Sequence, residues 1–325
     1  MTSSSRSSAA GSAAHRTATS GGVVPGLDAA PAFTLTTPPR LRLPVLIAVP
    51  HAGRAYPPAV TARLRDATLA QLRLEDRHVD RLGVAIARET GAALLVAHAP
   101  RALLDLNRAE DDIDWDMVEG GRPDDLPAAA PGHRGNARAR SGLGLVPRRL
   151  PGTGEIWRGR LDPGELDARI AGIHRAYHHA LGRELARIRA EWGAALLVDL
   201  HSMPPLRPAE GEVRAPVVVL GDRFGASCHN ALVGRALAHL EAAGIPAAQN
   251  RPYSGGYVLD RHGAPHDGVH AVQIEVCRAT YLDRHLAEPG AGLPAIAAML
   301  AGLVRELGAE TALLGGSESL RQAAE

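Results

Sequence analysis

The stretch that decides the fold is Ala194-Ala195-Leu196-Leu197-Val198-Asp199-Leu200-His201-Ser202, in which five apolar residues run into an acid and a histidine. A short continuous apolar run is typical of a strand buried on both faces, in a sheet that helices cover. Open α/β sheets bind their ligands at the carboxyl ends of such strands. Asp199 and His201 are two residues apart, so on a strand they would point to the same side. The stretch therefore predicts a strand end that suits a metal ligand, although a plain polar turn gives the same pattern.

Apolar runs and helical patterns alternate along the rest of the chain. Short apolar runs predict strands at 45–49, 92–97, 217–220, 245–248 and 269–276, with a further short run at 103–108. Apolar residues at helical spacing predict helices at about 59–72, 78–90, 162–192, 225–243 and 294–307. Alternating strands and helices are typical of layered α/β proteins. We therefore expect a three-layer α/β/α fold with a central mixed sheet.

The ends of the chain and one internal stretch lack such patterns. Residues 1–40 are mostly Ser, Ala, Gly, Thr and Pro, a composition that predicts a disordered N-terminal extension. Residues 41–314 would form a single domain, followed by a frayed tail at 315–325. Within the domain, residues 109–158 are acidic and then rich in Pro, Gly and Arg. A segment this long without elements is either a disordered insertion or a lid over a pocket, and we favour the lid.

Composition excludes several classes of function. The chain has 325 residues and a net charge of +1, so no strong field indicates a nucleic-acid or membrane partner. It contains no Lys, which excludes a lysine nucleophile. Its two cysteines, Cys228 and Cys277, are too few for a disulfide framework. These features indicate a cytoplasmic protein that acts on a small molecule.

Two apolar runs end in histidine, at His51 and at His201. Catalytic zinc commonly has three protein ligands, drawn from histidines and carboxylates, and an open position for water. The third ligand should be an acid near the same edge of the sheet. Glu75, Asp76 and Asp80 are the candidates, since they lie where the helix at 78–90 should begin. Each of them could instead cap that helix or lie on its surface.

Glu275 lies inside the apolar run at 269–276. A glutamate in such a strand is costly unless it is paired, bound to a metal or protonated. Near a zinc site its natural role is that of a general base, which takes a proton from water.

Two further polar stretches could bind a substrate. Asn107 and Arg108 follow the short run at 103–108, and an arginine can bind a carboxylate through two parallel hydrogen bonds. A surface arginine paired with Glu110 or Asp111 is the alternative. Gly256 and Tyr257 lie in a turn whose glycines let the backbone approach a ligand, or which is only a tight turn.

These stretches together resemble the N-formylglutamate amidohydrolase family. The resemblance covers about Leu43 to Leu307, and its motifs occur in the family's order: Pro50-His51-Ala52-Gly53, Asp76-Arg77-His78-Val79-Asp80, Asp105-Leu106-Asn107-Arg108, Asp199-Leu200-His201-Ser202, Gly255-Gly256-Tyr257 and Gly268-Val269-His270-Ala271-Val272-Gln273-Ile274-Glu275. The family is similar to zinc carboxypeptidases and aspartoacylases, which implies a phosphorylase/hydrolase-like fold. Those related families have a Glu three residues after the first His, where this chain has Arg54.

The resemblance implies a role for each candidate residue. His51, an acid and His201 would hold one Zn²⁺ ion, and we choose Asp76 as the acid. Asn107 and Arg108 would bind the substrate carboxylate, with Gly256 and Tyr257 beside it. Glu275 would activate the water, and Arg101, from its place before the short run, would stabilise the oxyanion together with zinc. Asp199 would orient the His201 ring or add negative charge to the site.

The implied activity is zinc-dependent hydrolysis of an N-formyl amino acid, with N-formyl-L-glutamate giving formate and L-glutamate. One alternative is hydrolysis of another N-acyl amino acid or of a peptidoglycan-like amide, since the 109–158 segment could shape a different side-chain pocket. A second alternative is a non-catalytic ligand-binding protein on the same scaffold. Other divalent ions could replace zinc in a His/carboxylate site.

Overall fold

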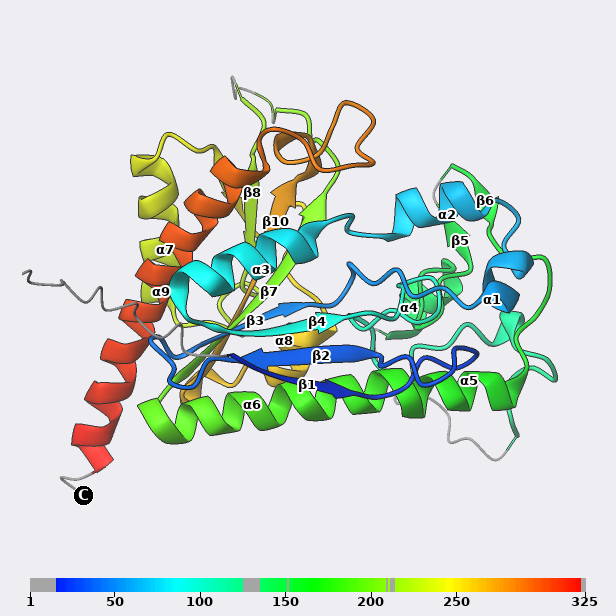
Figure 1. Cartoon of the computed structure of the whole chain (residues 1–325), viewed down its shortest axis with the longest axis horizontal. Helices are drawn as coiled ribbons and strands as arrows, with labels where there is room; N and C mark the ends of the chain where they lie inside the picture. Colours follow the sequence, from blue (N-terminus) through cyan, green and yellow to red (C-terminus); the bar gives the residue numbers. More distant parts are fainter. Residues whose placement is uncertain (1–15, 125–134, 151, 209, 211–213, 323–325) are drawn as a thin grey trace, which may run out of the picture.

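A mixed sheet forms the centre of the molecule (Figure 1). The computed structural model describes residues 16–124, 135–150, 152–208, 210 and 214–322. Within them the main sheet has eight strands in the order β1-β2-β4-β3-β7-β10-β8-β9. The strands are β1 (Thr17–Gly21), β2 (Phe33–Thr37), β3 (Val45–Val49), β4 (Ala93–Ala97), β7 (Ala195–Met203), β8 (Val218–Gly221), β9 (Ala247–Gln249) and β10 (Val269–Cys277). The four middle strands are parallel, whereas β2 and β8 run antiparallel to their neighbours β4 and β10.

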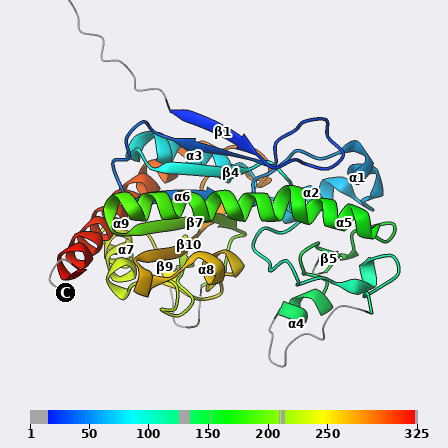
Figure 2. The ribbon, with the colours of Figure 1, turned by 90° about the horizontal axis from the view of Figure 1, so that it is seen from below.

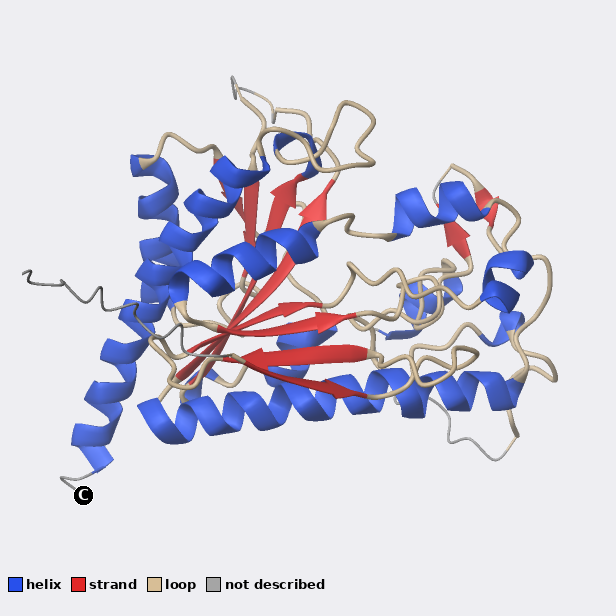
Figure 3. Ribbon diagram, viewed as in Figure 1, coloured by secondary structure: helices blue, strands red, loops and turns tan. Residues whose placement is uncertain are grey.

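Helices cover both faces of this sheet, as the blue helices around the red strands show in Figure 3. One face carries α3 (Val79–Thr90), α7 (Asn230–Ala242) and α9 (Leu293–Gln322), and the other carries α6 (Ala176–Trp192) and α8 (Tyr257–His262). The side chains of β3 divide between the two cores: Ile47 packs with α3, whereas Leu46 packs with α6. The predicted three-layer α/β/α fold is confirmed.

The two longest strands, β7 and β10, lie side by side at the centre of the sheet. Every residue of β7 is buried, as its unbroken apolar run predicts. β7 pairs in parallel with β3 on one side and with β10 on the other. In the second of these pairings Glu275 lies directly opposite His201. The backbone ladder thus fixes two of the candidate site residues relative to each other.

One long helix lies under the sheet in Figure 1 and along it in Figure 2. It consists of α5 (Pro163–Arg169), a π-helical segment (Ile170–Arg175) and α6. Asp162 caps its start, because its side chain accepts a hydrogen bond from the backbone N–H of Glu165. The helix predicted at 162–192 is therefore confirmed, with the π-helical segment as an addition.

The described part of the 109–158 segment is folded onto the domain. It contains a short 3₁₀ turn (Trp115–Met117), α4 (Gly135–Arg140) and a two-stranded sheet of β5 (Arg149–Leu150) and β6 (Gly154–Glu155). Its buried residues Met117, Leu145 and Trp157 join the same core as α6. The alternative of a disordered insertion is wrong for these residues; residues 125–134 lie outside the described part of the chain.

The N-terminal prediction is wrong from residue 16 onward, whereas residues 1–15 lie outside the described residues. β1 and β2 extend the main sheet, with β2 antiparallel to β4. Phe33 is buried against Tyr177, and the Arg16 guanidinium donates to the carbonyl oxygens of Ala87 and Ala92 at 3.0 and 2.6 Å. The Ser-, Ala- and Gly-rich average over residues 1–40 hid the short stretch Phe33-Thr34-Leu35-Thr36-Thr37, whose residues have high strand propensity.

Three further boundaries differ from the predictions. The helix expected at 59–72 is two helices, α1 (Pro58–Arg63) and α2 (Ala67–Leu74), because the chain is extended at Leu64 and Asp66 caps the second helix. The run at 103–108 forms turns rather than a strand. The tail expected to fray from 315 continues as α9 to Gln322, since α9 packs through Leu314 on the core directly before these residues.

No helix of the described residues is long and apolar enough to cross a membrane.

The packing of β2 predicts that Phe33→Ala lowers the free energy of unfolding by about 3 kcal/mol, because it leaves a cavity against Tyr177. Urea denaturation followed by circular dichroism measures this. Thr19→Ala on the exposed strand β1 is the control and should change stability by less than about 0.5 kcal/mol. An unchanged midpoint for Phe33→Ala would show that β2 does not belong to the core.

Candidate active site

The candidate residues meet in a cavity at the carboxyl ends of the parallel strands, as expected for an open α/β sheet. The cavity has a volume of about 580 Å³. His51 reaches it from the turn after β3, His201 from β7 and Glu275 from β10. Asp76 enters from the connection between α2 and α3.

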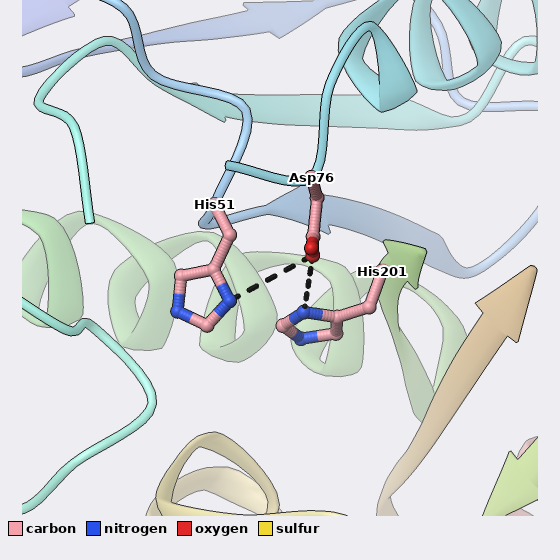
Figure 4. Close-up of side chains that lie close together, drawn as sticks. All are labelled: His51, Asp76 and His201. Carbon is pink, nitrogen blue, oxygen red and sulfur yellow. Dashed lines mark hydrogen bonds and ion pairs between the residues drawn. The ribbon is translucent and has the colours of Figure 1, made fainter. Parts of the chain in front are cut away.

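His51, Asp76 and His201 point toward one another (Figure 4). One oxygen of Asp76 lies 3.0 Å from Nδ1 of His201 and 3.8 Å from Nδ1 of His51. One ligand atom from each residue lies within 4.8 Å of the other two, and all three residues are buried. Among the described residues this is the only group of histidines, cysteines and acids close enough to share a metal ion.

The other two acids considered for the third position have different partners. The carboxylate of Glu75 pairs with Arg77 at 3.0 Å. Asp80 pairs with Arg54 at 2.9 Å. Arg54 stands where the zinc carboxypeptidases and aspartoacylases have a Glu, and this pair lies outside the His51-Asp76-His201 group. This geometry favours Asp76 as the third ligand.

Two contacts fix Asp76 in place. Its backbone N–H donates to the carbonyl oxygen of His51 at 2.9 Å, which ties the two ligand segments together. The Arg278 guanidinium donates to Oδ1 of Asp76 at 2.9 Å, so Oδ2 is the oxygen that faces the histidines. Burial alone would raise the pKa of Asp76, but the hydrogen bond from His201 and the nearby positive charges hold that pKa below its usual range.

Each histidine is also held by a second carboxylate. Nε2 of His51 lies 2.7 Å from Asp105, and Nε2 of His201 lies 2.9 Å from Asp199. Burial opposes the charged form of His201, yet the Asp199 carboxylate raises its pKa well above the usual value. For His51, burial and then the charge of Arg101 lower the pKa. Carboxylates in these positions fix the ring orientation of metal-binding histidines.

The residues present fit a divalent metal ion. Nδ1 of His51 is buried and has no hydrogen-bond partner in the part of the chain that the structure describes. Because Nε2 of His51 donates to Asp105, Nδ1 keeps its lone pair and faces Asp76 and His201. Two imidazoles and one carboxylate are a ligand set of catalytic zinc sites.

Glu275 borders the same cavity, 8 % exposed. The side-chain amide of Gln273 donates to its Oε1 at 2.9 Å. Burial raises the pKa of Glu275 to about 7, despite the opposing charge of His201. A carboxyl group with a pKa near neutrality can both accept and return a proton, as a general base must.

The residues predicted to bind substrate divide into two groups. Asn107, Arg108 and Gly256 line the cavity. A Cβ on Gly256 would lie 2.6 Å from Oδ1 of Asn107, so this close approach requires glycine. Tyr257 is not among the cavity-lining residues; its ring stacks on His174 with centroids 5.6 Å apart, and a role for it in binding substrate stays a prediction.

Comparison with known proteins decides the family. A profile described as "FGase: N-formylglutamate amidohydrolase" matches residues 43–282, which is most of the chain. The chain belongs to the N-formylglutamate amidohydrolase family. It is 35 % identical over 285 residues to the N-formylglutamate deformylase of Pseudomonas aeruginosa, which covers 86 % of this chain and 96 % of that relative. The N-formylglutamate deformylase of Pseudomonas putida is 34 % identical over 74 % of this chain and 83 % of its own length.

A solved structure agrees with this assignment. The N-formylglutamate amidohydrolase of Ralstonia eutropha superposes with a TM-score of 0.75 and 30 % identity, covering 86 % of this chain and 98 % of that one. The resemblance inferred from the motifs is confirmed. As a member of the N-formylglutamate amidohydrolase family, the chain is an enzyme, a hydrolase of linear amides.

Sequence reasoning missed three residues of this amidohydrolase site. Asp105 holds His51 and also accepts from Arg101 at 2.9 Å, and Arg101 lies in the cavity wall. Arg278 fixes Asp76, and Gln273 fixes Glu275. Asp105 was the detectable one, because it begins the motif that contains Asn107. Arg278 lies beyond the end of β10 and gave no signal in the sequence.

The geometry predicts that Asp76→Ala lowers the affinity for Zn²⁺ by at least about 100-fold, because it removes one of the three ligand atoms. Competition with a chromophoric chelator measures the affinity. Asp80→Asn is the matched control: it changes an acid four residues away that pairs with Arg54, and it should bind zinc like the parent protein. Equal affinity in both variants would rule out Asp76 as a ligand.

Proposed function

We propose that the enzyme hydrolyses N-formyl-L-glutamate to formate and L-glutamate and that it uses one zinc ion held by His51, Asp76 and His201. The observation that carries the proposal is the position of Glu275, which borders the same cavity as this ligand group and lies opposite His201 in the sheet. The names of the two Pseudomonas relatives support the choice of substrate.

A zinc ion at these ligands would supply a Lewis acid for the formyl carbonyl and would lower the pKa of a bound water. The remaining chemistry depends on the protein's own groups. Asp105 and Asp199 hold the two imidazoles, and Arg278 holds Asp76. The three proposed ligand groups are therefore already in place before a metal ion binds.

Glu275 is the proposed general base. It takes a proton from the attacking water and then gives that proton to the amide nitrogen that leaves as the amine of glutamate. The amide of Gln273 holds Oε1, which leaves Oε2 of Glu275 for this proton. A pKa raised by burial supports both halves of the transfer.

Arg101 is the proposed electrostatic partner of the oxyanion. It lines the cavity and pairs with Asp105, and its guanidinium is a preorganised positive charge beside the histidines. Fixed charges of this kind stabilise developing negative charge without reorganisation during the reaction.

Arg108 and Asn107 are the proposed binding residues for the α-carboxylate. Arg108 is anchored through Nε to the carbonyl of Leu143 and through Nη1 to the carbonyl of Asn107, which holds its planar head against the cavity. The side-chain nitrogen of Asn107 donates one hydrogen to Gln273 at 3.3 Å and has a second hydrogen to offer.

The charge of the cavity wall supports a substrate with two carboxylates. Among its lining residues are five arginines and two acids: Arg73, Arg101, Arg108, Arg138 and Arg278, with Asp76 and Glu275. An excess of positive charge in a cleft favours anionic ligands. Arg138 and Leu150 come from the 109–158 segment, which supports a role for that segment as the lid or outer wall of the substrate pocket.

The proposal predicts that Glu275→Gln keeps its zinc and loses about 10²–10⁴-fold in kcat, because glutamine preserves shape but cannot accept the proton. Formate release from N-formyl-L-glutamate measures turnover, and metal analysis of the same sample measures zinc. Full activity in this variant would remove Glu275 from the mechanism.

A substrate panel tests the other half of the proposal. N-formyl-L-glutamate should be hydrolysed with a kcat/KM at least about tenfold above those of N-formyl-L-aspartate and N-acetyl-L-glutamate, and removing zinc with a chelator should abolish all three activities. A higher kcat/KM for N-formyl-L-aspartate or N-acetyl-L-glutamate would contradict the choice of N-formyl-L-glutamate as substrate.

A further inference from the structure

Three histidines and a tyrosine lie together behind the proposed carboxylate-binding residues. His174 and His178 come from the long helix under the sheet, and Tyr257 and His262 come from α8. His174 and His178 are fully buried, yet none of the four residues lines the cavity. The proposed reaction does not use these residues. Because burying a polar imidazole is costly, the burial of His174 and His178 needs another explanation.

The two helix histidines bind the backbone on either side of Asn107. They are four residues apart and therefore lie on one face of the helix. Nε2 of His178 lies 3.0 Å from the carbonyl oxygen of Leu106, and Nε2 of His174 lies 2.9 Å from that of Arg108. A carbonyl oxygen only accepts, so both Nε2 atoms carry the hydrogen and donate it.

The remaining two residues hold this pair of imidazoles in place. His262 lies with Nε2 at 3.0 Å from Nδ1 of His178, and the two rings are stacked. The ring of Tyr257 stacks on His174 and meets His178 edge-on, with centroids 5.2 Å apart in the second contact. Because Nε2 of His178 carries the hydrogen, its Nδ1 accepts one from His262.

All three imidazoles are held in the neutral form. Burial, then the charges of the neighbouring histidines, puts the pKa of His178 well below its usual value, and burial lowers the pKa of His262 to about 3. Burial also lowers the pKa of His174. A neutral ring on His178 keeps a lone pair on Nδ1 for the hydrogen bond from His262, while Nε2 donates to the carbonyl oxygen of Leu106.

The segment held in this way continues into the reacting groups. Oδ1 of Asn107 accepts from the backbone N–H of Val258 at 2.9 Å, and Nδ2 donates to Gln273, whose amide in turn donates to Glu275. The side chain of Asn107 is therefore fixed from the cavity side, whereas its backbone is fixed by the histidines from behind. A shift of the 106–108 backbone would move both Asn107 and Arg108.

We propose that His174 and His178 are positioning residues that hold the 106–108 backbone so that Asn107 and Arg108 bind the α-carboxylate of the substrate. This proposal rests on the proposed function, because it assumes that these two side chains meet the substrate carboxylate. The histidines act through the backbone and touch neither the substrate nor the reacting atoms.

The test compares two amide replacements that differ in reach. In His174→Gln and His178→Gln the amide nitrogen can stand near the position of Nε2, whereas in the Asn variants it is too short to reach the carbonyl. We expect the Asn variants to raise the KM for N-formyl-L-glutamate about tenfold, with kcat changed less than about threefold, and the Gln variants to stay within about threefold of the parent KM. His179→Asn, on the exposed side of the same helix, is the matched control and should change nothing.

A second substrate separates positioning from general loosening of the structure. It is N-formyl-L-glutamate with its α-carboxylate replaced by a carboxamide. For this analogue the Asn variants should change KM less than about twofold, because the carboxylate that the histidines help to bind is missing. Equal KM increases for both substrates, or no increase for either, would overturn the proposal.

The outcomes distinguish this proposal from the proposed function. A parent enzyme without activity on N-formyl-L-glutamate, or without preference for it over the analogue, would contradict the proposed function. A parent enzyme with that preference and Asn variants with unchanged KM would overturn only the positioning role. If the Asn variants do not fold, His262→Leu is the deciding variant, because it removes the hydrogen bond to His178 at a half-buried position. We expect it to raise the KM about threefold, and an unchanged KM would overturn the proposal.

Discussion

The site depends on the compensation of negative charge that is buried at the carboxyl ends of the parallel strands. A carboxylate without a partner in a protein interior is costly, and several of them close together repel each other. Here Asp76, Asp105 and Asp199 are all buried around two imidazoles. Arg101 neutralises one of these acids and Arg278 another, and the pKa of His201 is raised by the Asp199 carboxylate. Each acid therefore has a positive or hydrogen-bonding neighbour.

This compensation gives the residues two roles: His51, Asp76 and His201 are the proposed metal ligands, and Asp105 and Asp199 orient the two imidazoles. The Nδ1 atoms of both imidazoles face Asp76. Their Nε2 atoms form hydrogen bonds with Asp105 and Asp199. A divalent cation between the Nδ1 atoms and Asp76 would add two positive charges beside the buried acids. The same positive charge would favour the ionised form of Glu275, whose pKa burial raises.

Much of this could be predicted from the sequence because the signals were local. The run before Asp199 identified a buried central strand, and strand-end histidines identified both imidazoles. The turn at 103–108 was missed, since a short apolar run fits a strand as well as a buried turn. The roles of Arg278 and His174 depend on contacts between segments 202 and 66 residues apart, which no pattern in one sequence encodes. The choice among three neighbouring acids likewise needed the direction of the side chains.

The parallel pairing of β7 with β10 has a consequence for how this enzyme could be redesigned. His201 and Glu275, the proposed ligand and the proposed general base, lie on adjacent strands whose spacing is set by main-chain hydrogen bonds. The outer wall of the cavity comes instead from α2, the 109–158 segment and the turn before α8, represented by Arg73, Arg138 and Tyr253. The paired strands and most of the outer wall thus belong to different parts of the fold, so residues of the 109–158 segment can be changed without changing the distance between β7 and β10.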